Sequence, residues 1–182
     1  MLKLLTPFAL LLLLTGCGAP GFFTIEQIDE PGLRNASTLN ANEPQWDFKR
    51  PANWEISDKD WTEMHQDSST AYLRELRQNN GRRFYVTAPG KQPDSGALVE
   101  LKVTDIDRGH YTFFTYMPAV VQANLTITDA KSGKVLFKGK GKSRTSGGAG
   151  PASYGDGGRI ESAHVVMASE IIRLVEYYNG PK

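Results

Sequence analysis

The sequence predicts an α+β fold, an antiparallel sheet of three to five strands packed with two long helices in the order helix, strands, helix. Residues 58–79 and 159–178 repeat apolar side chains with helical spacing. Between them, 97–107 and 120–128 alternate apolar and polar residues, as strands with one solvated face do. Such a sheet needs cover on its apolar face, so both helices lie there or one lies on each face.

The first helix has clear boundaries. Ser57 can cap its start, Asp58 and Asp60 suit its positive end, and Asn79-Asn80-Gly81 stops it. His65 lies beside the apolar stripe, where we expect a boundary histidine rather than a ligand. The stripe itself consists of Trp61, Met64, Ser68, Ala71, Tyr72 and Leu76.

The strands follow in order. Residues 82–88 form a short strand, and 129–133 form a five-residue hairpin loop ending in glycine before the return strand 134–145. A glycine-rich loop, 145–158, leads to the second helix, 159–178.

The N-terminal segment is a predicted signal peptide, residues 1–16. Lys3 precedes an apolar run, Leu4–Leu14. At ~1.5 Å per residue, about 11 helical residues span only half of a ~30 Å hydrocarbon core, too short for an ordinary transmembrane helix.

Leu14-Thr15-Gly16-Cys17 resembles the lipobox of bacterial lipoproteins. The resemblance implies cleavage between Gly16 and Cys17, a diacylglycerol on the Cys17 thiol and an acyl chain on its amine. Two or three chains anchor a protein firmly, because each buried methylene contributes ~0.8 kcal/mol. By analogy with enterobacterial sorting, Gly18 favours the outer membrane, facing the periplasm. The alternative is an ordinary secretory signal with a chance cysteine.

Residues 17–57 are predicted to be the lipidated cysteine and a tether rich in glycine and proline, before the α+β domain at 58–182. Such a tether would span roughly 35 Å root-mean-square. Within it, Phe22, Phe23, Ile25 and Ile28 form a short strand or lie against the domain. Trp46, Trp54 and Trp61 bind glycan or membrane, or dock the tether onto the core, which we favour.

Composition excludes several classes of function. Removing 1–16 deletes Lys3 and leaves 20 basic and 20 acidic side chains, which argues against a nucleic-acid binder. Cys17 is the only cysteine, so an internal disulfide and a cysteine-based zinc site are excluded.

No motif indicates catalysis, a metal or a cofactor beyond the lipid on Cys17. Gly139–Ser143 resembles a phosphate loop but has Leu136 where the first glycine is needed. His65, His110 and His164 lack the spacing of a helical metal pair, and we expect His164 to be a satisfied core histidine. The alternative is a periplasmic hydrolase or glycan-binding enzyme whose site the motifs do not reveal.

Basic residues occupy even positions along the last strand: Lys134, Lys138, Lys140, Lys142 and Arg144, with Leu136 interrupting. Alternate strand residues share a face, so this face can bind anionic headgroups, lipopolysaccharide phosphates or an acidic envelope protein. The interpretation we favour is a solvated face, or lysines protecting an exposed sheet edge. Gly139 and Gly141 leave the opposite side thin, which indicates a bulge or close backbone approach.

The aromatic connection 111–118 has two interpretations. An exposed patch of Phe113, Phe114, Tyr116 and Met117 would contact a membrane or a partner. Alternatively, Phe113 or Phe114 enters the core.

"ALVELKVTDIDRG", "ANLTITDAKSGKVLFKGKGKS", the glycine-rich stretch and the final helix are similar to small proteobacterial lipoproteins of unknown function. This resemblance implies the sandwich thought to be shared with curli-assembly and Tol-type periplasmic domains, and it supplies no catalytic residues. We therefore expect a membrane-anchored envelope lipoprotein acting as a non-enzymatic accessory, assembly or binding module, with its oligomeric state left open.

Overall fold

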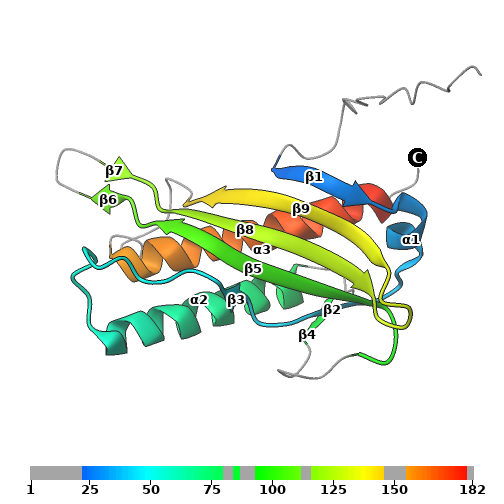
Figure 1. The fold of residues 1–182 in the computed structure, drawn as a ribbon, viewed down its shortest axis with the longest axis horizontal. Helices are drawn as coiled ribbons and strands as arrows, with labels where there is room; N and C mark the ends of the chain where they lie inside the picture. The colour runs from blue at the N-terminus through cyan, green and yellow to red at the C-terminus, as the bar shows by residue number, and fades with distance from the viewer. Residues whose placement is uncertain (1–21, 80–83, 87–92, 112–115, 146–154, 180–182) are drawn as a thin grey trace, which may run out of the picture.

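The computed structural model describes residues 22–79, 84–86, 93–111, 116–145 and 155–179, which form a mixed seven-stranded sheet and three helices (Figure 1). The helices are α1 (Glu30–Asn35), α2 (Asp58–Gln78) and α3 (Asp156–Asn179). The sheet contains β1 (Phe23–Ile28), β2 (Leu39–Ala41), β3 (Gln45–Trp46), β4 (Phe84–Val86), β5 (Ala97–Asp107), β8 (Val120–Asp129) and β9 (Val135–Arg144). A separate hairpin pairs β6 (His110–Tyr111) with β7 (Tyr116–Met117).

The sheet is mixed rather than wholly antiparallel. Its order is β1-β9-β8-β5-β2-β4. β3 also pairs with β5, at residues 102–103, whereas β2 pairs with residues 97–99 of the same strand. The β1–β9, β9–β8 and β8–β5 ladders are antiparallel. In contrast, β2 and β3 run parallel to β5, and β4 runs parallel to β2. The prediction of three to five antiparallel strands therefore holds for β1, β9, β8 and β5, but β2, β3 and β4 add a parallel part that it did not include.

Regular structure begins within the expected tether. Residues 23–46 contribute β1, α1, β2 and β3 to the fold, and β1 confirms the short strand that is one of two interpretations of Phe22, Phe23, Ile25 and Ile28. Strands of two or three residues carry no periodic pattern, and Pro31-Gly32 read as a chain break. The proline instead stands in the first turn of α1, where its missing N–H costs no hydrogen bond.

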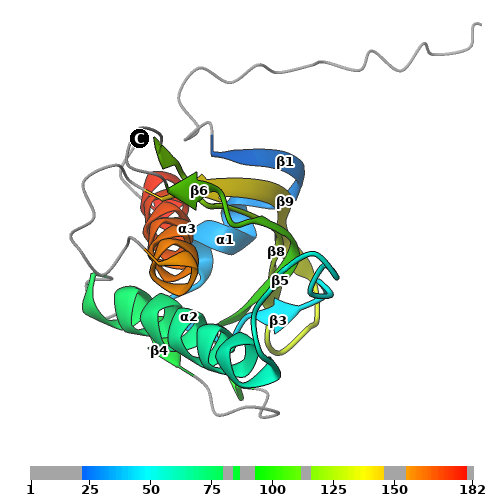
Figure 2. The ribbon, with the colours of Figure 1, turned by 90° about the vertical axis from the view of Figure 1, so that its left-hand side faces the viewer.

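Both long helices cover the same face of the sheet, where they lie side by side and run in the same direction (Figures 1 and 2). The predicted start of α2 is confirmed, because Ser57 Oγ accepts a 3.1 Å hydrogen bond from the Asp60 amide. The inward residues of β5 and β8, including Leu101, Leu125 and Ile127, are buried against this helical layer. Opposite them, Lys102 is exposed and Glu100 half-buried, as expected for a solvated face.

The β8–β9 turn matches its prediction. Asp129 Oδ1 accepts hydrogen bonds from Ser132 N at 2.7 Å and Ser132 Oγ at 2.6 Å. Gly133 has a φ of +69°, which glycine adopts without strain. Among the described residues, no helix is long and apolar enough to cross a membrane.

Candidate functional site

The basic residues of β9 lie on the outer face of the sheet. Lys138, Lys140, Lys142 and Arg144 are exposed, and they alternate with buried or thin positions facing the helices. A bulge explains the interruption at Leu136: Phe137 pairs with Ile127 and Val135 with Thr128, so Leu136 is the extra residue. Lys134 precedes the bulge and the strand, so it is separated from the other four.

The edge-protection interpretation is wrong, because β9 is not an edge strand. β1 covers it, and β1 also supplies carboxylates that neutralise part of the basic face. Glu26 lies 2.8 Å from Lys140 Nζ and 3.5 Å from Lys138 Nζ, while Asp29 lies 2.7 Å from Lys134 Nζ. Hydrogen bonds from Lys140 and Lys134 lower the pKa of the Glu26 and Asp29 carboxyl groups.

Lys142 and Arg144 form no ion pair within the described part of the chain. Across the sheet, Lys142 pairs in register with Gln122, whose amide donates to Asp105 Oδ2 at 2.8 Å. Four cations therefore share this part of the face with three carboxylates, those of Glu26, Asp105 and Asp107, and Asp107 is in register with Arg144 across β8. The remaining positive charge is concentrated at the Lys142–Arg144 end of β9.

The chain reaches this face at the start of β1. Phe23 pairs with Gly141, between Lys140 and Lys142. A Cβ on Gly141 would lie 2.6 Å from the Phe23 ring, and one on Gly139 would lie 2.8 Å from the Thr24 carbonyl oxygen. The close backbone approach predicted from the two glycines is thus confirmed, since β9 must be thin for β1 to pack against it.

The hairpin β6–β7 continues from β5 beyond the end of β9 (Figure 1). Tyr116 and Met117 are 39% and 47% exposed, which favours the surface-patch interpretation for these two residues. Phe113 and Phe114 lie outside the described residues, as do Gly16 and Cys17.

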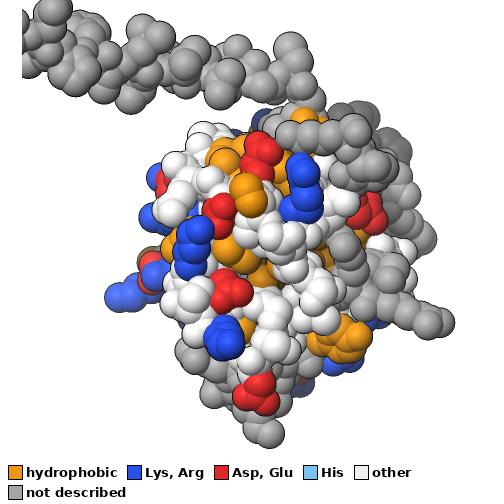
Figure 3. Space-filling view, turned by 90° about the vertical axis from the view of Figure 1, so that its right-hand side faces the viewer, with side chains coloured by type: hydrophobic (Ala, Val, Ile, Leu, Met, Phe, Trp, Pro, Cys, Tyr) orange, Lys and Arg blue, Asp and Glu red, His pale blue; other side chains and the backbone are white. Residues whose placement is uncertain are grey.

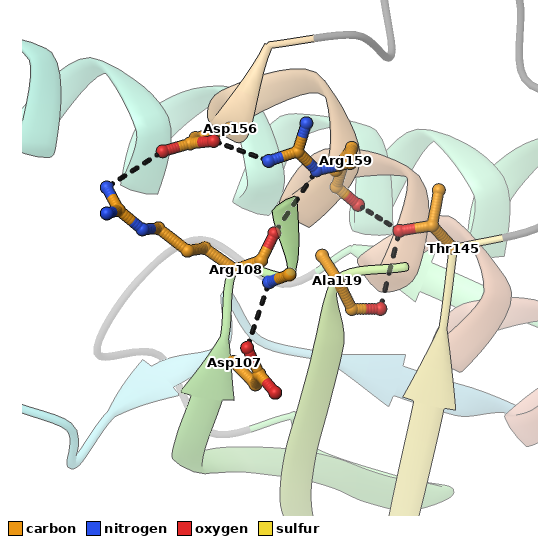
Figure 4. Close-up of polar contacts among 7 residues, drawn as sticks. Asp107, Arg108, Ala119, Thr145, Asp156 and Arg159 are labelled. Carbon is orange, nitrogen blue, oxygen red and sulfur yellow. Dashed lines mark hydrogen bonds and ion pairs between the residues drawn. The ribbon is translucent and has the colours of Figure 1, made fainter. Parts of the chain in front are cut away.

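A partly buried polar network lies at the end of the sheet where β5 and β9 terminate (Figure 4). Asp156, in the first turn of α3, contacts two arginines: Arg159 Nη2 at 2.5 Å and Arg108 Nη1 at 3.0 Å. Arg159 Nε also donates to the Arg108 carbonyl oxygen at 3.1 Å, and Thr145 Oγ1 donates to the Arg159 carbonyl oxygen at 2.9 Å. The network ties the end of β9 and the loop after β5 to the start of α3.

Sequence reasoning missed this network. Arg159 is only 2% exposed, yet an arginine in the first turn of an amphipathic helix gives no signal that distinguishes it from a solvated one. Asp156 and Arg108 lie in segments that the sequence marks only as loops.

The three tryptophans pack together rather than forming an open binding surface. Trp61 contacts Trp46 and Trp54 edge-on, with ring centroids 6.1 and 5.8 Å apart. They pack around a core cluster that includes Met64, Val103 and Ile160, so the docking interpretation is confirmed. Arg108 lies over the Trp54 ring, 5.6 Å from its centroid.

Two of the histidines, His65 and His164, lie beside the tryptophans. His65 is half-buried beside the stripe, as predicted, and His164 is completely buried. The prediction of a satisfied core histidine holds for only one of the two ring nitrogens of His164: Nδ1 is 2.8 Å from the Ile160 carbonyl oxygen, whereas Nε2 has no hydrogen-bond partner among the described residues. Burial lowers the pKa of His65 and, with the nearby His65, lowers the pKa of His164 to about 4.

Two of the shallow clefts on the described surface are lined by ionisable side chains from more than one element. One, of about 360 Å³, lies between α1 and the β8–β9 turn and is lined by Asp29, Asp129 and Lys134. Figure 3 shows this end of the molecule, where acidic and basic side chains are interspersed. The other, of about 260 Å³, is lined by Glu43, Trp46 and His65 among others.

In the second cleft, His65 stacks on the Trp46 ring and covers one of its faces. No hydrogen bond joins His65 to Glu43 in the described regions. No group of three His, Cys, Asp or Glu residues that could hold a metal occurs among the described residues.

No protein-family model matches the sequence, and no curated protein matches it. Among solved structures, XCC0632 from Xanthomonas campestris, described as DUF330, has a TM-score of 0.50 and 11% identity, covering 82% of this chain and 90% of that chain. The PelC dodecamer from Paraburkholderia phytofirmans gives 0.48 and 12%, covering 88% of this chain and 99% of that one. Lipoprotein GNA1162 from Neisseria meningitidis gives 0.33 and 16%, covering 64% and 88%. These are distant likenesses, and at such identities they concern the fold alone.

Proposed function

We propose that this chain is an envelope lipoprotein, anchored through lipid on Cys17, that works by binding rather than by catalysis. The observation that carries the proposal is the basic outer face next to the start of β1. Two cations, Lys142 and Arg144, have no ion pair in the described regions, and the chain from Cys17 joins the sheet beside them. We assign the face to an anionic envelope partner, which is either lipid or protein.

The lipid anchor is tested by replacing Cys17 with serine in the native host. We expect the variant to leave the membrane fraction and the unmodified protein to carry diacylglycerol, measured by fractionation and by mass spectrometry of the mature N-terminus. A Cys17→Ser protein that matures and stays with membranes as before would refute the anchor.

The binding face is tested separately with Lys142→Glu and Arg144→Glu together. Reversing Lys138 or Lys140 would place new carboxylates beside Glu26 and disturb β1, so those positions are unsuitable. We expect weaker recovery of the envelope partner in crosslinking and pull-down from membranes. The control reverses Arg77, which is exposed on α2 in the helical layer and has no ion pair in the described regions, and recovery should be unchanged.

A further inference from the structure

We infer that the outer face of β9, along the β1 edge of the sheet, docks against an anionic lipid surface, with Lys140, Lys142 and Arg144 contacting the headgroups. This inference rests on the proposed lipid at Cys17 and goes beyond it by naming the partner and the orientation. Its physical basis is the distance that the chain can cover between the lipid and the sheet.

The connection between anchor and domain is short. Residues 18–21 separate Cys17 from Phe22, the first described residue, and at ~3.3–3.6 Å per residue this stretch reaches at most about 18 Å. A tether extending to residue 57 would have left the domain free to tumble. Because β1 is paired to β9, the start of this ladder stays within about two Debye lengths of the membrane. The Debye length is ~8 Å at physiological salt.

The attachment point also selects which side faces the lipid. Phe23 lies opposite Gly141, so Lys140 and Lys142 are the charges nearest to the place where the chain arrives. Arg144 follows two residues later on the same face, roughly 7 Å along the strand. The helical layer lies on the opposite side of the sheet (Figure 2), and reaching the surface with that layer would require turning the domain over.

The charge of the face fits anionic headgroups. Lys138, Lys140, Lys142 and Arg144 on β9 are opposed by Glu26 on β1 and, two strands away on β5, by the exposed Asp105 and Asp107. The positive excess therefore lies along β9, where an anionic surface would attract it. Near such a surface each cation contributes about fivefold to the docked population, which corresponds to ~1 kcal/mol.

The test uses the full lipidated chain in vesicles of phosphatidylcholine alone or mixed with phosphatidylglycerol. Because Cys17 is the only cysteine and carries the lipid, a cysteine introduced elsewhere is the single free thiol. A fluorophore at Thr24→Cys reports the β1–β9 side, since Thr24 is exposed and pairs with Lys140. A fluorophore at Thr70→Cys reports the opposite side of the domain, since Thr70 is exposed on α2 in the helical layer. Quenching by lipids with nitroxide headgroups measures the proximity of each label to the surface.

We expect strong quenching at position 24 and weak quenching at position 70 in the mixed vesicles, and a smaller difference in phosphatidylcholine. Lys142→Gln with Arg144→Gln should reduce the ratio of docked to undocked protein about 25-fold, because two contributions of about fivefold each are lost. The control is Arg77→Gln on α2, which has no ion pair in the described regions and should leave the ratio unchanged.

Equal quenching of both labels, or no effect of the Lys142 and Arg144 substitutions, would overturn the docking. That is also the result expected if the face serves an acidic protein instead of lipid. Failure of the anchor is distinct, because the protein would then not float with either kind of vesicle, and this would overturn both proposals.

Discussion

The imidazole of His65 stacks on the indole of Trp46, with ring centroids 3.7 Å apart and ring planes inclined by 19°. His164 also stacks with Trp46, at 5.2 Å and 22°. One two-residue strand, β3, thus brings a tryptophan against histidines from both long helices. This contact joins the segment before α2 to the helical layer, and it makes the domain sensitive to acid.

Acid should destabilise the fold through His164. Its pKa is lowered to about 4 by burial, against ~6.5 in an unfolded chain, so the folded state binds fewer protons between these values. The stabilising contribution of neutral His164 is present above pH 6.5, falls as the pH falls towards 4, and changes no further below that. The expected loss of unfolding free energy is about 3 kcal/mol. Urea titrations at several pH values measure it.

His164→Leu should flatten the decline between pH 6.5 and 4. His110→Gln is the matched control, because His110 is exposed, and it should leave the profile in place. An unchanged slope in the His164 variant would show that another group carries the acid sensitivity.

Trp46→Ala should destabilise the domain by about 3 kcal/mol, at the low end for a buried large aromatic because Trp46 is only half-buried. The vacated space also admits water to His164, so we expect the pKa of His164 to rise towards its ordinary value. An NMR titration of the imidazole follows this change. Loss of stability with the His164 pKa still depressed would mean that other residues exclude the water.

Arg159→Met should cost about 2–3 kcal/mol of stability, less than a fully buried pair, because Asp156 is 37% exposed and keeps its contact with Arg108. Lys59→Met is the control: Lys59 is 81% exposed and pairs with Glu63, which is 54% exposed, so the change should be within ~0.5 kcal/mol. Chemical denaturation compares the two variants. Equal effects would contradict a structural role for the network in Figure 4.

Gly139→Ala should loosen β1, since the new Cβ would lie 2.8 Å from the Thr24 carbonyl oxygen, and the expected cost is about 1–3 kcal/mol. Gly157→Ala provides the opposite case: nothing lies within 4 Å of its Cβ, and alanine favours the helix by up to ~1 kcal/mol. Hydrogen exchange of the β1 amides distinguishes local loosening from global destabilisation. Protection of β1 that survives Gly139→Ala would contradict the proposed close packing.

The periodicity of apolar and polar residues in the sequence predicted the long helices and strands. The expected strand 97–107 matches β5 in both bounds, and the expected helix 58–79 differs from α2 by one residue. Such elements repeat one face often enough to be recognised. β2 and β3 have three and two residues, and their place in the sheet depends on parallel pairing with β5, a distant contact that local sequence does not encode.

The candidate face was predicted in part. The alternation of residues along the last strand predicted five basic residues on one face, and four of them lie there. It could not show that β1 covers β9 or that Glu26 neutralises two of the lysines. Those facts depend on a register between residues more than one hundred positions apart. The buried Arg159 had no sequence signal at all.

The pairing of β1 with β9 also constrains the order of events when the chain is made. β1 is the first strand to be synthesised, yet its partner is the last strand of the sheet. The first strand must therefore remain unpaired until β9 has been synthesised, and its ladder with Phe137–Gly141 is among the last contacts of the sheet that can form.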